Sequence, residues 1–284
     1  ALQSVELDQP GKCSGEEGWV PLCALPFDEC PDDPDKTEPG VCGCGVPDID
    51  TDEDGYMDCV DACPFDPNRW EEGECSGVIA ARLIHYRGSS FGSAGIASDK
   101  KPLFSGSTAT FDNYTSYSRG INSVLVDITG LPEGSAISAS DFEFKVGNSN
   151  NLETWTTAPA PSSVTAVPEA GVDGSARVEI VWADGAIQKQ WLRIEVLANA
   201  NTGLQAPDIF YYGNAIGETG NSATDAIVNA TDQVLTRSNS SSFRQVEVTN
   251  RYDFNKDGLV NITDVLVSRA NPSGFTPLKL ISAP

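Results

Sequence analysis

Residues 48–68 form an unusually acidic stretch, DIDTDEDGYMDCVDACPFDPN. It holds seven aspartates and one glutamate in 21 positions, and it contains no lysine or arginine to offset them. Acidic runs are usually solvated faces or disordered tails. The other interpretation is a cage of carboxylates that folds around cations. The spacing of the aspartates decides between the two.

The aspartates alternate with other residues and surround a glycine. An EF-hand calcium loop places its first three side chains and its sharp bend in the same way. Numbered on that loop, the predicted ligands are Asp50, Asp52, Asp54, Asp58 and Asp61, with the carbonyl oxygen of Tyr56. Five carboxylates within about 10 Å repel one another unless a divalent ion intervenes, so we expect folding of this stretch to depend on calcium.

The cysteines are confined to the same part of the chain. All eight lie within residues 1–76, at Cys13, Cys23, Cys30, Cys42, Cys44, Cys59, Cys63 and Cys75. An even number of cysteines in a Pro-, Gly- and Asp-rich region predicts a disulfide-stapled module made for an oxidising environment. Zinc binding is the weaker alternative, because the spacings are C-x-C and C-x3-C and the chain has one histidine.

A repeat within this region suggests a pairing of the cysteines. CPDDPDKTEPGVC at 30–42 matches CPFDPNRWEEGEC at 63–75, and both copies begin and end with a cysteine. If equivalent cysteines do equivalent jobs, the repeat predicts the pairs Cys30–Cys42 and Cys63–Cys75. The remaining cysteines would then pair as Cys13–Cys23 and Cys44–Cys59, although eight cysteines allow about 105 connectivities.

A second repeat relates the segment 221–239 to the segment 253–271. Its second copy carries the calcium-loop spacing, with predicted ligands Asp253, Asn255, Asp257, Asn261 and Asp264 and the carbonyl oxygen of Leu259. The corresponding residues of the first copy are Asn221, Asp225, Asn229 and Asp232, with the carbonyl oxygen of Ile227. Each loop is expected to run into a short helix, capped and charged at its start by a Thr-Asp pair.

The first copy departs from the pattern at two positions. Ala223 replaces the ligand at position 3, and Ala226 replaces the glycine at position 6. Three interpretations therefore stay open: the loop binds calcium weakly, it borrows a ligand such as Asn214 or Glu218 from the preceding segment, or it is a structural relic.

The middle of the chain alternates apolar and polar residues with a period of two, which predicts half-buried antiparallel strands and a β-sandwich. The strand candidates are 78–87, 122–130, 141–148, 176–199 and 208–214. The Asp184-Gly185 pair is predicted to form a hairpin turn. Trp155, Trp182 and Trp191 are predicted to pack in the core, the alternative being a sugar-binding platform.

Two family resemblances follow from these motifs. Residues 48–75 resemble a thrombospondin type 3 repeat, in which acidic segments wrap around calcium ions and are stapled by disulfides. Residues 214–284 resemble a dockerin domain, whose duplicated D-x-N-x-D-G-x-x-N-x-x-D segments each precede a helix. The dockerin resemblance implies a cohesin-like β-sandwich partner, contacted through Ala230, Thr231, Ile262, Thr263, Arg237 and Arg269.

The expected fold is mainly β. It comprises a disulfide-rich, calcium-wrapped module at 1–76, a jelly-roll-like antiparallel β-sandwich at 77–213 and a small α-helical dockerin-like domain at 214–284. Positions 1–76 carry 21 Asp+Glu against 3 Lys+Arg, out of totals of 41 and 18. This charge makes nucleic acid a poor partner and cations good ones. No apolar run is long enough to span a membrane.

The leading functional hypothesis is a non-enzymatic, calcium-binding structural or adhesive protein of the cell surface or extracellular matrix. Its sandwich and its docking module together allow head-to-tail assembly into a fibre. The alternative is a carbohydrate-binding or scaffold-docking module of a larger extracellular assembly. Glu143, Glu153, Glu179 and Glu195 are interpreted as outward-facing strand residues rather than catalytic acids. No signal peptide is visible, so Ala1 is either a mature N-terminus left by cleavage, the interpretation we favour, or the start of an expressed fragment.

Overall fold

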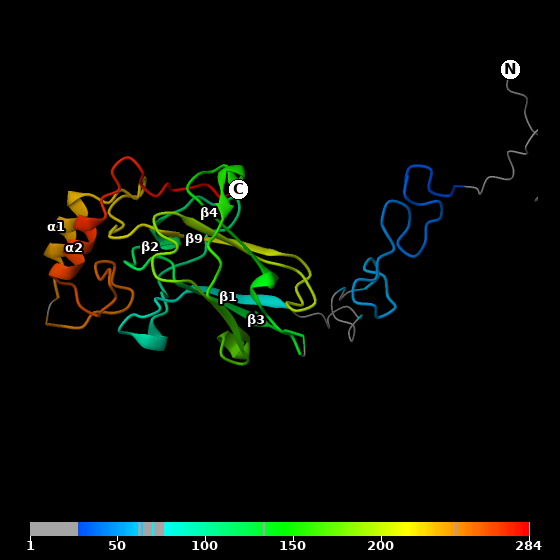
Figure 1. Cartoon of the computed structure of the whole chain (residues 1–284), viewed down its shortest axis with the longest axis horizontal. Coiled ribbons are helices and arrows are strands. Elements are labelled where there is room, and N and C mark those ends of the chain that lie inside the picture. Colours follow the sequence, from blue (N-terminus) through cyan, green and yellow to red (C-terminus); the bar gives the residue numbers. More distant parts are fainter. Residues whose placement is uncertain are drawn as a thin grey trace, which may run out of the picture.

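The computed structural model describes residues 28–61, 64, 70, 77–132, 134–241 and 243–283. In this part of the chain the fold is mainly β, as the sequence predicted, with two sheets, two α-helices and two disulfides. The helices lie side by side at one end of the sheets (Figure 1). None of the helices in the described ranges is long and apolar enough to cross a membrane.

The first sheet has four strands in the order β1-β3-β7-β6, all antiparallel. Its strands are β1 (Val78–Ile84), β3 (Ser123–Thr129), β6 (Ser163–Val167) and β7 (Ala176–Val181). The second sheet has five strands in the order β2-β9-β8-β4-β5. They are β2 (Tyr114–Thr115), β4 (Phe142–Gly147), β5 (Thr156–Thr157), β8 (Trp191–Val196) and β9 (Asp208–Asn214).

The predicted period-2 strands form because their apolar side chains share one face. Val124, Val126 and Ile128 of β3 are fully buried. They belong to one hydrophobic cluster with Ile194 of β8 and Phe210 of β9, so the two sheets are held together by their facing apolar side chains. One pairing departs from the antiparallel expectation, because β2 runs parallel to β9.

The predicted hairpin at Asp184-Gly185 is wrong. The flanking strands β7 and β8 belong to different sheets, so the connection crosses from one sheet to the other. The turn is held by the segment before β3: Asp184 accepts from Arg119 at 2.8 Å and from Asn122 at 2.7 Å. The Gly185 N–H also donates to the Arg119 carbonyl. These contacts replace the cross-strand ladder that a hairpin would need.

The C-terminal segment packs on the outer side of the second sheet. A second hydrophobic cluster joins Trp191 and Tyr211 of this sheet to Ala226, Leu278 and Ile281. The Trp191 indole N–H donates to the Lys279 carbonyl at 2.8 Å. Residues on both sides of the predicted boundary at 213/214 therefore share a core, and the predicted domain limits stay a prediction.

The tryptophans predicted to lie in the core do so. Trp155, Trp182 and Trp191 are 7%, 2% and 0% exposed. Each indole N–H donates to a backbone carbonyl oxygen, those of Ser149, Pro159 and Lys279 respectively. A buried aromatic whose polar edge is satisfied is a packing residue, so none of the three offers a platform to a ligand.

The two helices are α1 (Ala230–Ser238) and α2 (Ile262–Ala270). Their N-caps are Asn229 and Asn261, not the Thr-Asp pairs that the sequence predicted. Each asparagine side chain accepts from the backbone N–H two residues later, while Asp232 or Asp264 closes a capping box from the third helical position. The aspartates do supply the predicted negative charge in the first turn. Short 3-10 helices lie at Gly92–Ala94, Phe111–Asn113, Ala139–Asp141, Leu152–Thr154 and Val172–Gly174.

The disulfides of the described N-terminal segment differ from the predicted pairs. Cys30 bonds to Cys44 and Cys42 bonds to Cys59, so the predicted pairs Cys30–Cys42 and Cys44–Cys59 are wrong. The predicted pairs Cys13–Cys23 and Cys63–Cys75 lie outside the described residues.

The cause is the fold of the segment between these cysteines. The Lys36 ammonium donates to the carbonyl oxygens of Pro39, Gly43 and Val46 at 3.0, 2.9 and 2.7 Å. It also pairs with the Asp48 carboxylate at 3.1 Å. Residues 39–48 therefore wrap around Lys36, which brings Cys44 rather than Cys42 against Cys30.

Candidate metal centre

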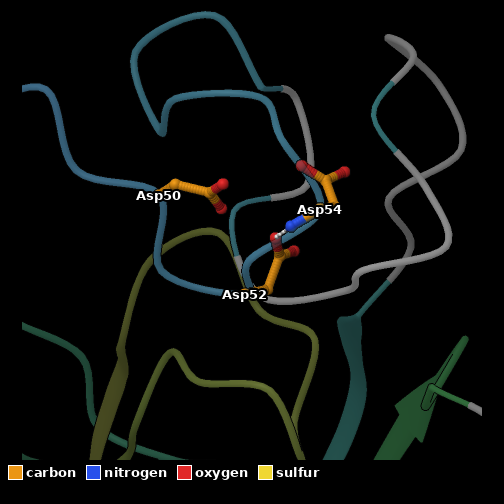
Figure 2. Close-up of side chains that lie close together, drawn as sticks. All are labelled: Asp50, Asp52 and Asp54. Atoms are coloured by element: carbon orange, nitrogen blue, oxygen red, sulfur yellow. Dashed lines mark hydrogen bonds between the residues drawn. The ribbon is translucent and has the colours of Figure 1, made fainter.

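Three predicted ligands at the N-terminal end converge. Carboxylate oxygens of Asp50, Asp52 and Asp54 all lie within 4.8 Å of one another (Figure 2). Among the residues that the structure describes, this is the one group of three or more His, Cys, Asp or Glu side chains close enough to share a metal ion. An oxygen-only donor set of this kind suits a hard cation such as Ca²⁺.

Backbone hydrogen bonds hold the loop in this shape. The N–H of Gly55 donates to Asp50 at 3.0 Å, that of Asp54 to Asp52 at 3.2 Å, and that of Tyr56 to Asp54 at 2.8 Å. Gly55 has a φ of 100°, a value that favours glycine and permits the bend. Each aspartate thus uses one oxygen to organise the loop.

The other oxygen of each aspartate is buried and has no hydrogen-bond partner. These atoms are Oδ1 of Asp50, Oδ2 of Asp52 and Oδ2 of Asp54. Buried carboxylate oxygens without partners are costly, and three in one loop call for a shared cation. The pKa of Asp52 is raised, first by burial and then by the neighbouring carboxylates of Asp54, Asp61 and Asp50. The charge of a divalent ion would oppose both causes, because it favours the ionised carboxylates.

The remaining predicted ligands of this loop, Asp58, Asp61 and Tyr56, lie next to the three converging aspartates in the sequence. Asp58 accepts from the backbone N–H of Thr51 at 2.8 Å and from its hydroxyl at 2.7 Å. Asp61 is 7% exposed. The backbone N–H of Tyr56 faces Asp54. Asp58 therefore ties the end of the loop to its start at Thr51, although Asp58 and Asp61 do not belong to the converging group.

The second C-terminal loop, at 253–264, repeats the same hydrogen bonds. Gly258 donates to Asp253 at 2.9 Å, Asp257 to Asn255 at 3.1 Å, and Leu259 to Asp257 at 2.9 Å. Position by position, these are the bonds of the N-terminal loop. Two sequences that share little beyond their spacing therefore fold into one loop type.

Two carboxylates of the second loop are fully buried. Asp264 accepts from the N–H groups of Phe254 and Asn261 at 2.8 and 3.0 Å, which closes the loop onto helix α2. Burial raises the pKa of Asp253 to about 6, with Asp264 adding to the shift and the nearby Lys256 opposing it. Lys256 is itself buried, and burial lowers its pKa to about 8.

Calcium binding at the second loop is expected to weaken on acidification. The folded-state pKa of Asp253, about 6, lies above its ordinary value of 3.8, so a proton competes with the ion below pH 6. Affinity should fall roughly tenfold between neutral pH and about pH 5. In calcium-free buffer, acidification is expected to stabilise the fold instead. Asp253 contributes folding stability that is fully present below its unfolded pKa and is lost as pH rises through about 6.

Calcium titrations at the two pH values measure this effect, using a variant in which Asp50, Asp52 and Asp54 are replaced by asparagine to silence the N-terminal loop. An affinity that does not change with pH would contradict the role of Asp253.

The first C-terminal loop departs from this pattern. Of its three equivalent bonds only one is present, from the N–H of Ile227 to Asp225 at 3.3 Å. Asp232 is fully buried, but it accepts from the backbone N–H and hydroxyl of Thr219, which precedes the loop. Asn229 is engaged as the helix cap, and Asn221 is exposed. Ala223 removes the side-chain acceptor at position 3. Ala226 keeps its backbone N–H, but it does not adopt the positive φ with which Gly55 and Gly258 bend the other two loops.

Lys36 is a functional residue that the sequence analysis missed. Its ammonium occupies the centre of a loop in the first N-terminal repeat, where three carbonyl oxygens and Asp48 surround it. This is the donor set of a hard cation, and here a covalently attached charge fills it. No clear signal for this role was present in the sequence, because the equivalent position of the other copy also carries a cationic residue, Arg69.

Replacement of Lys36 by methionine is expected to destabilise the N-terminal segment by about 2 kcal/mol, because three carbonyl oxygens and a carboxylate lose a charged donor. Millimolar calcium should restore little of this loss, since Asp48 is the one carboxylate among the oxygens that contact Lys36. Chemical unfolding with and without calcium tests the prediction, with Lys101→Met as a control for the loss of an exposed lysine. Full rescue by calcium would contradict it.

Of the carboxylates weighed as catalytic acids, Glu179 lies closest to a titratable partner, with its Oε1 3.3 Å from Nδ1 of His85. Glu179 accepts from the Ser123 hydroxyl at 2.9 Å, and Glu195 accepts from Arg193 at 2.6 Å. Glu143 and Glu153 are exposed. Comparison of the chain with protein-family models, with curated proteins and with solved structures found no match.

Proposed function

We propose that this chain is a calcium-stabilised structural protein of the extracellular space, in which bound ions hold the fold in shape. The observation that carries the proposal is the group formed by Asp50, Asp52 and Asp54, each with one buried, unpartnered carboxylate oxygen. Calcium supplies the positive charge that these oxygens lack. Without it, their mutual repulsion opposes the folding of the loop.

The matching hydrogen bonds of the second C-terminal loop support the same ion there. Gly55 and Gly258 occupy equivalent places, and each donates to the first aspartate of its loop. We accordingly assign residues 48–75 to a thrombospondin type 3-like module, residues 214–284 to a dockerin-like module, and the two sheets between them to a β-sandwich. Disulfides among the described cysteines are compatible with secretion.

Calcium at the second C-terminal loop would also hold the helices to the sheets. The Phe254 carbonyl accepts from the Ser118 N–H, and the Lys256 carbonyl accepts from the Ser90 N–H at 3.0 Å. Both carbonyls belong to the loop, and both donors belong to segments next to the first and second sheets. An ion that holds the loop in shape therefore also holds this junction together. Extracellular calcium-binding modules have Kd values of about 10⁻⁴ to 10⁻³ M.

A second candidate function, docking onto a partner protein, is favoured by the outer face of the helices. Val234 of α1 and Leu266 of α2 stand at equivalent places of the repeat and are 62% and 50% exposed. Ile262, at the start of α2, is 68% exposed. A second copy of this chain, bound head-to-tail through such a face, would build a fibre.

Electron microscopy of the protein with calcium and after chelation separates these functions. Calcium-dependent filaments that Leu266→Glu abolishes would support both stiffening and docking. A protein that gains thermal stability from calcium but stays monomeric would keep the calcium role and reject the fibre. A protein whose unfolding ignores calcium would contradict the proposal as a whole.

A further inference from the structure

Strand β6, at Ser163–Val167, is a free edge of the first sheet. It pairs with β7 on one side, and among the described residues its backbone groups make no other hydrogen bond. Four of its five residues are exposed, and Val164 is half-buried. Unpaired N–H and C=O groups along a sheet edge form a template on which another extended chain can add a strand.

The other sheet edges in the described part of the chain are protected. β1, the opposite edge of the same sheet, has an irregular register between Ile79 and Ala81, and its Arg82 donates to Asp208 at 2.7 Å. The edge strands of the second sheet, β2 and β5, are two residues long each. Bulges, charged side chains and very short strands are common means of preventing edge pairing. By comparison β6 is longer, uncharged and regular in register.

The charge of the region around β6 indicates which partner fits this edge. Residues 154–168 contain no Asp, Glu, Lys or Arg and are the longest such stretch of a chain whose formal net charge is −23. Two molecules of so acidic a chain repel one another wherever their carboxylates face each other. A strand edge without charge is a surface through which two of them can meet, and it offers nothing that would attract a charged partner.

Prolines limit the length of any strand that pairs here. Pro161 and Pro168 flank β6, and neither has a backbone N–H to donate. In an antiparallel pair centred on Thr165, Pro168 of each molecule lies just beyond the last paired residue. This register uses the whole free edge of both molecules and leaves none for a third. The contact is therefore self-complementary and closed, as in a two-fold dimer.

Both faces of such a pair are compatible with the side chains of β6. Successive residues of a strand point to opposite faces. On one face Val164, which packs against the main hydrophobic cluster, would lie opposite Ala166 of the second molecule and extend the core. On the other face Thr165 would lie opposite its own equivalent, and Val167, which is 53% exposed, opposite Ser163. Pairs of threonines across strands stabilise a sheet.

We propose that β6 is a dimerisation site, where two molecules of this chain pair antiparallel about Thr165 and join their four-stranded sheets into one. The contact involves neither the calcium loops nor the outer face of the helices, so it does not depend on the function proposed above. Because each molecule contributes a single short strand, the dimer dissociates on dilution.

Sedimentation velocity of the full chain over a range of concentrations, at physiological ionic strength, tests the proposal. We expect a monomer–dimer equilibrium. Thr165→Lys places two ammonium groups opposite each other and should weaken dimerisation by at least about tenfold, because like charges directly opposite destabilise a strand pair. Thr156→Lys, the same change at an exposed threonine of β5, should dimerise as the unmodified protein does. An unmodified protein that stays monomeric, or a Thr165→Lys variant that dimerises equally well, would overturn the proposal.

A mixing experiment separates pairing at Thr165 from an indirect effect of the substitution. Thr165→Asp alone should also be monomeric, because it sets two carboxylates opposite each other. An equimolar mixture of Thr165→Lys and Thr165→Asp is expected to restore the dimer, since opposite charges then meet. A mixture that stays monomeric would overturn the proposal. So would a dimer that survives Thr165→Lys but is lost in Leu266→Glu, because its interface would lie on the helices.

Discussion

Replacement of Asp52 by asparagine is expected to have opposite effects with and without calcium. In calcium-free buffer the variant should be more stable than the unmodified protein by about 1 kcal/mol, because one of the converging carboxylates is neutralised. With calcium it should be less stable by about 1 kcal/mol, because a charged ligand is lost. The Oδ1 of asparagine can still accept from the Asp54 N–H, so the loop geometry is retained.

The control is Asp32→Asn, which changes the net charge equally at an exposed position outside the loop. This variant should shift stability in the same small measure with and without calcium. Thermal unfolding under both conditions measures the four values. If Asp52→Asn stabilised the protein both with and without calcium, the aspartates would repel one another without binding an ion.

Trp191→Ala is expected to cause the largest loss of stability in the chain, about 3 to 5 kcal/mol. The side chain is fully buried in the cluster that joins the second sheet to the C-terminal segment. Its removal leaves a cavity and also orphans the Lys279 carbonyl oxygen. Because the cluster is shared, the sheets and the helices should lose stability together.

Phe275→Ala is the matched control, since this aromatic lies in the same C-terminal segment and is fully exposed. It should change stability by no more than about 0.5 kcal/mol. Denaturant unfolding followed by helical and aromatic circular dichroism measures both variants. Separate transitions for helices and sheets in the unmodified protein would contradict a shared core.

The spacing of the aspartates predicted the two organised loops because their geometry is local. Alternate side chains turn inward and a glycine bends the chain within a short stretch, so neither loop needs distant contacts to take shape. The strands at 122–130 and 141–148 were predictable for a similar reason, since period-2 alternation reflects a sheet with one buried face.

The incorrect or missing predictions concern structure that depends on tertiary contacts, which the sequence does not show. The cysteine pairing followed the repeat, but Lys36 folds one copy around its own ammonium and so moves Cys44 into place. The turn at Asp184 is set by Arg119, which lies far away in the sequence. Strand β6 was not predicted, because its apolar and polar residues hardly alternate. It is an edge strand whose residues are mostly exposed on both faces.

For the first C-terminal loop, the sequence left three interpretations open. Its sequence shows which ligands are missing and names Asn214 and Glu218 as residues that could replace them. The structure separates these two, because the amide of Asn214 is bonded to backbone while Glu218 lies against Tyr114 with one carboxylate oxygen unpartnered. Its counterpart Asn250 gives no hint of this, because local hydrogen bonding is the same in both copies.

A calcium titration followed at the Gly55 backbone amide tests whether the N-terminal loop holds calcium. This N–H donates to Asp50, so its NMR resonance reports on the coordination of that carboxylate. We expect a saturable shift with half-saturation at about 10⁻⁴ to 10⁻³ M calcium, absent from Asp54→Asn at the same concentrations. A resonance that does not move, or that drifts equally in both proteins up to about 10 mM, would contradict the account.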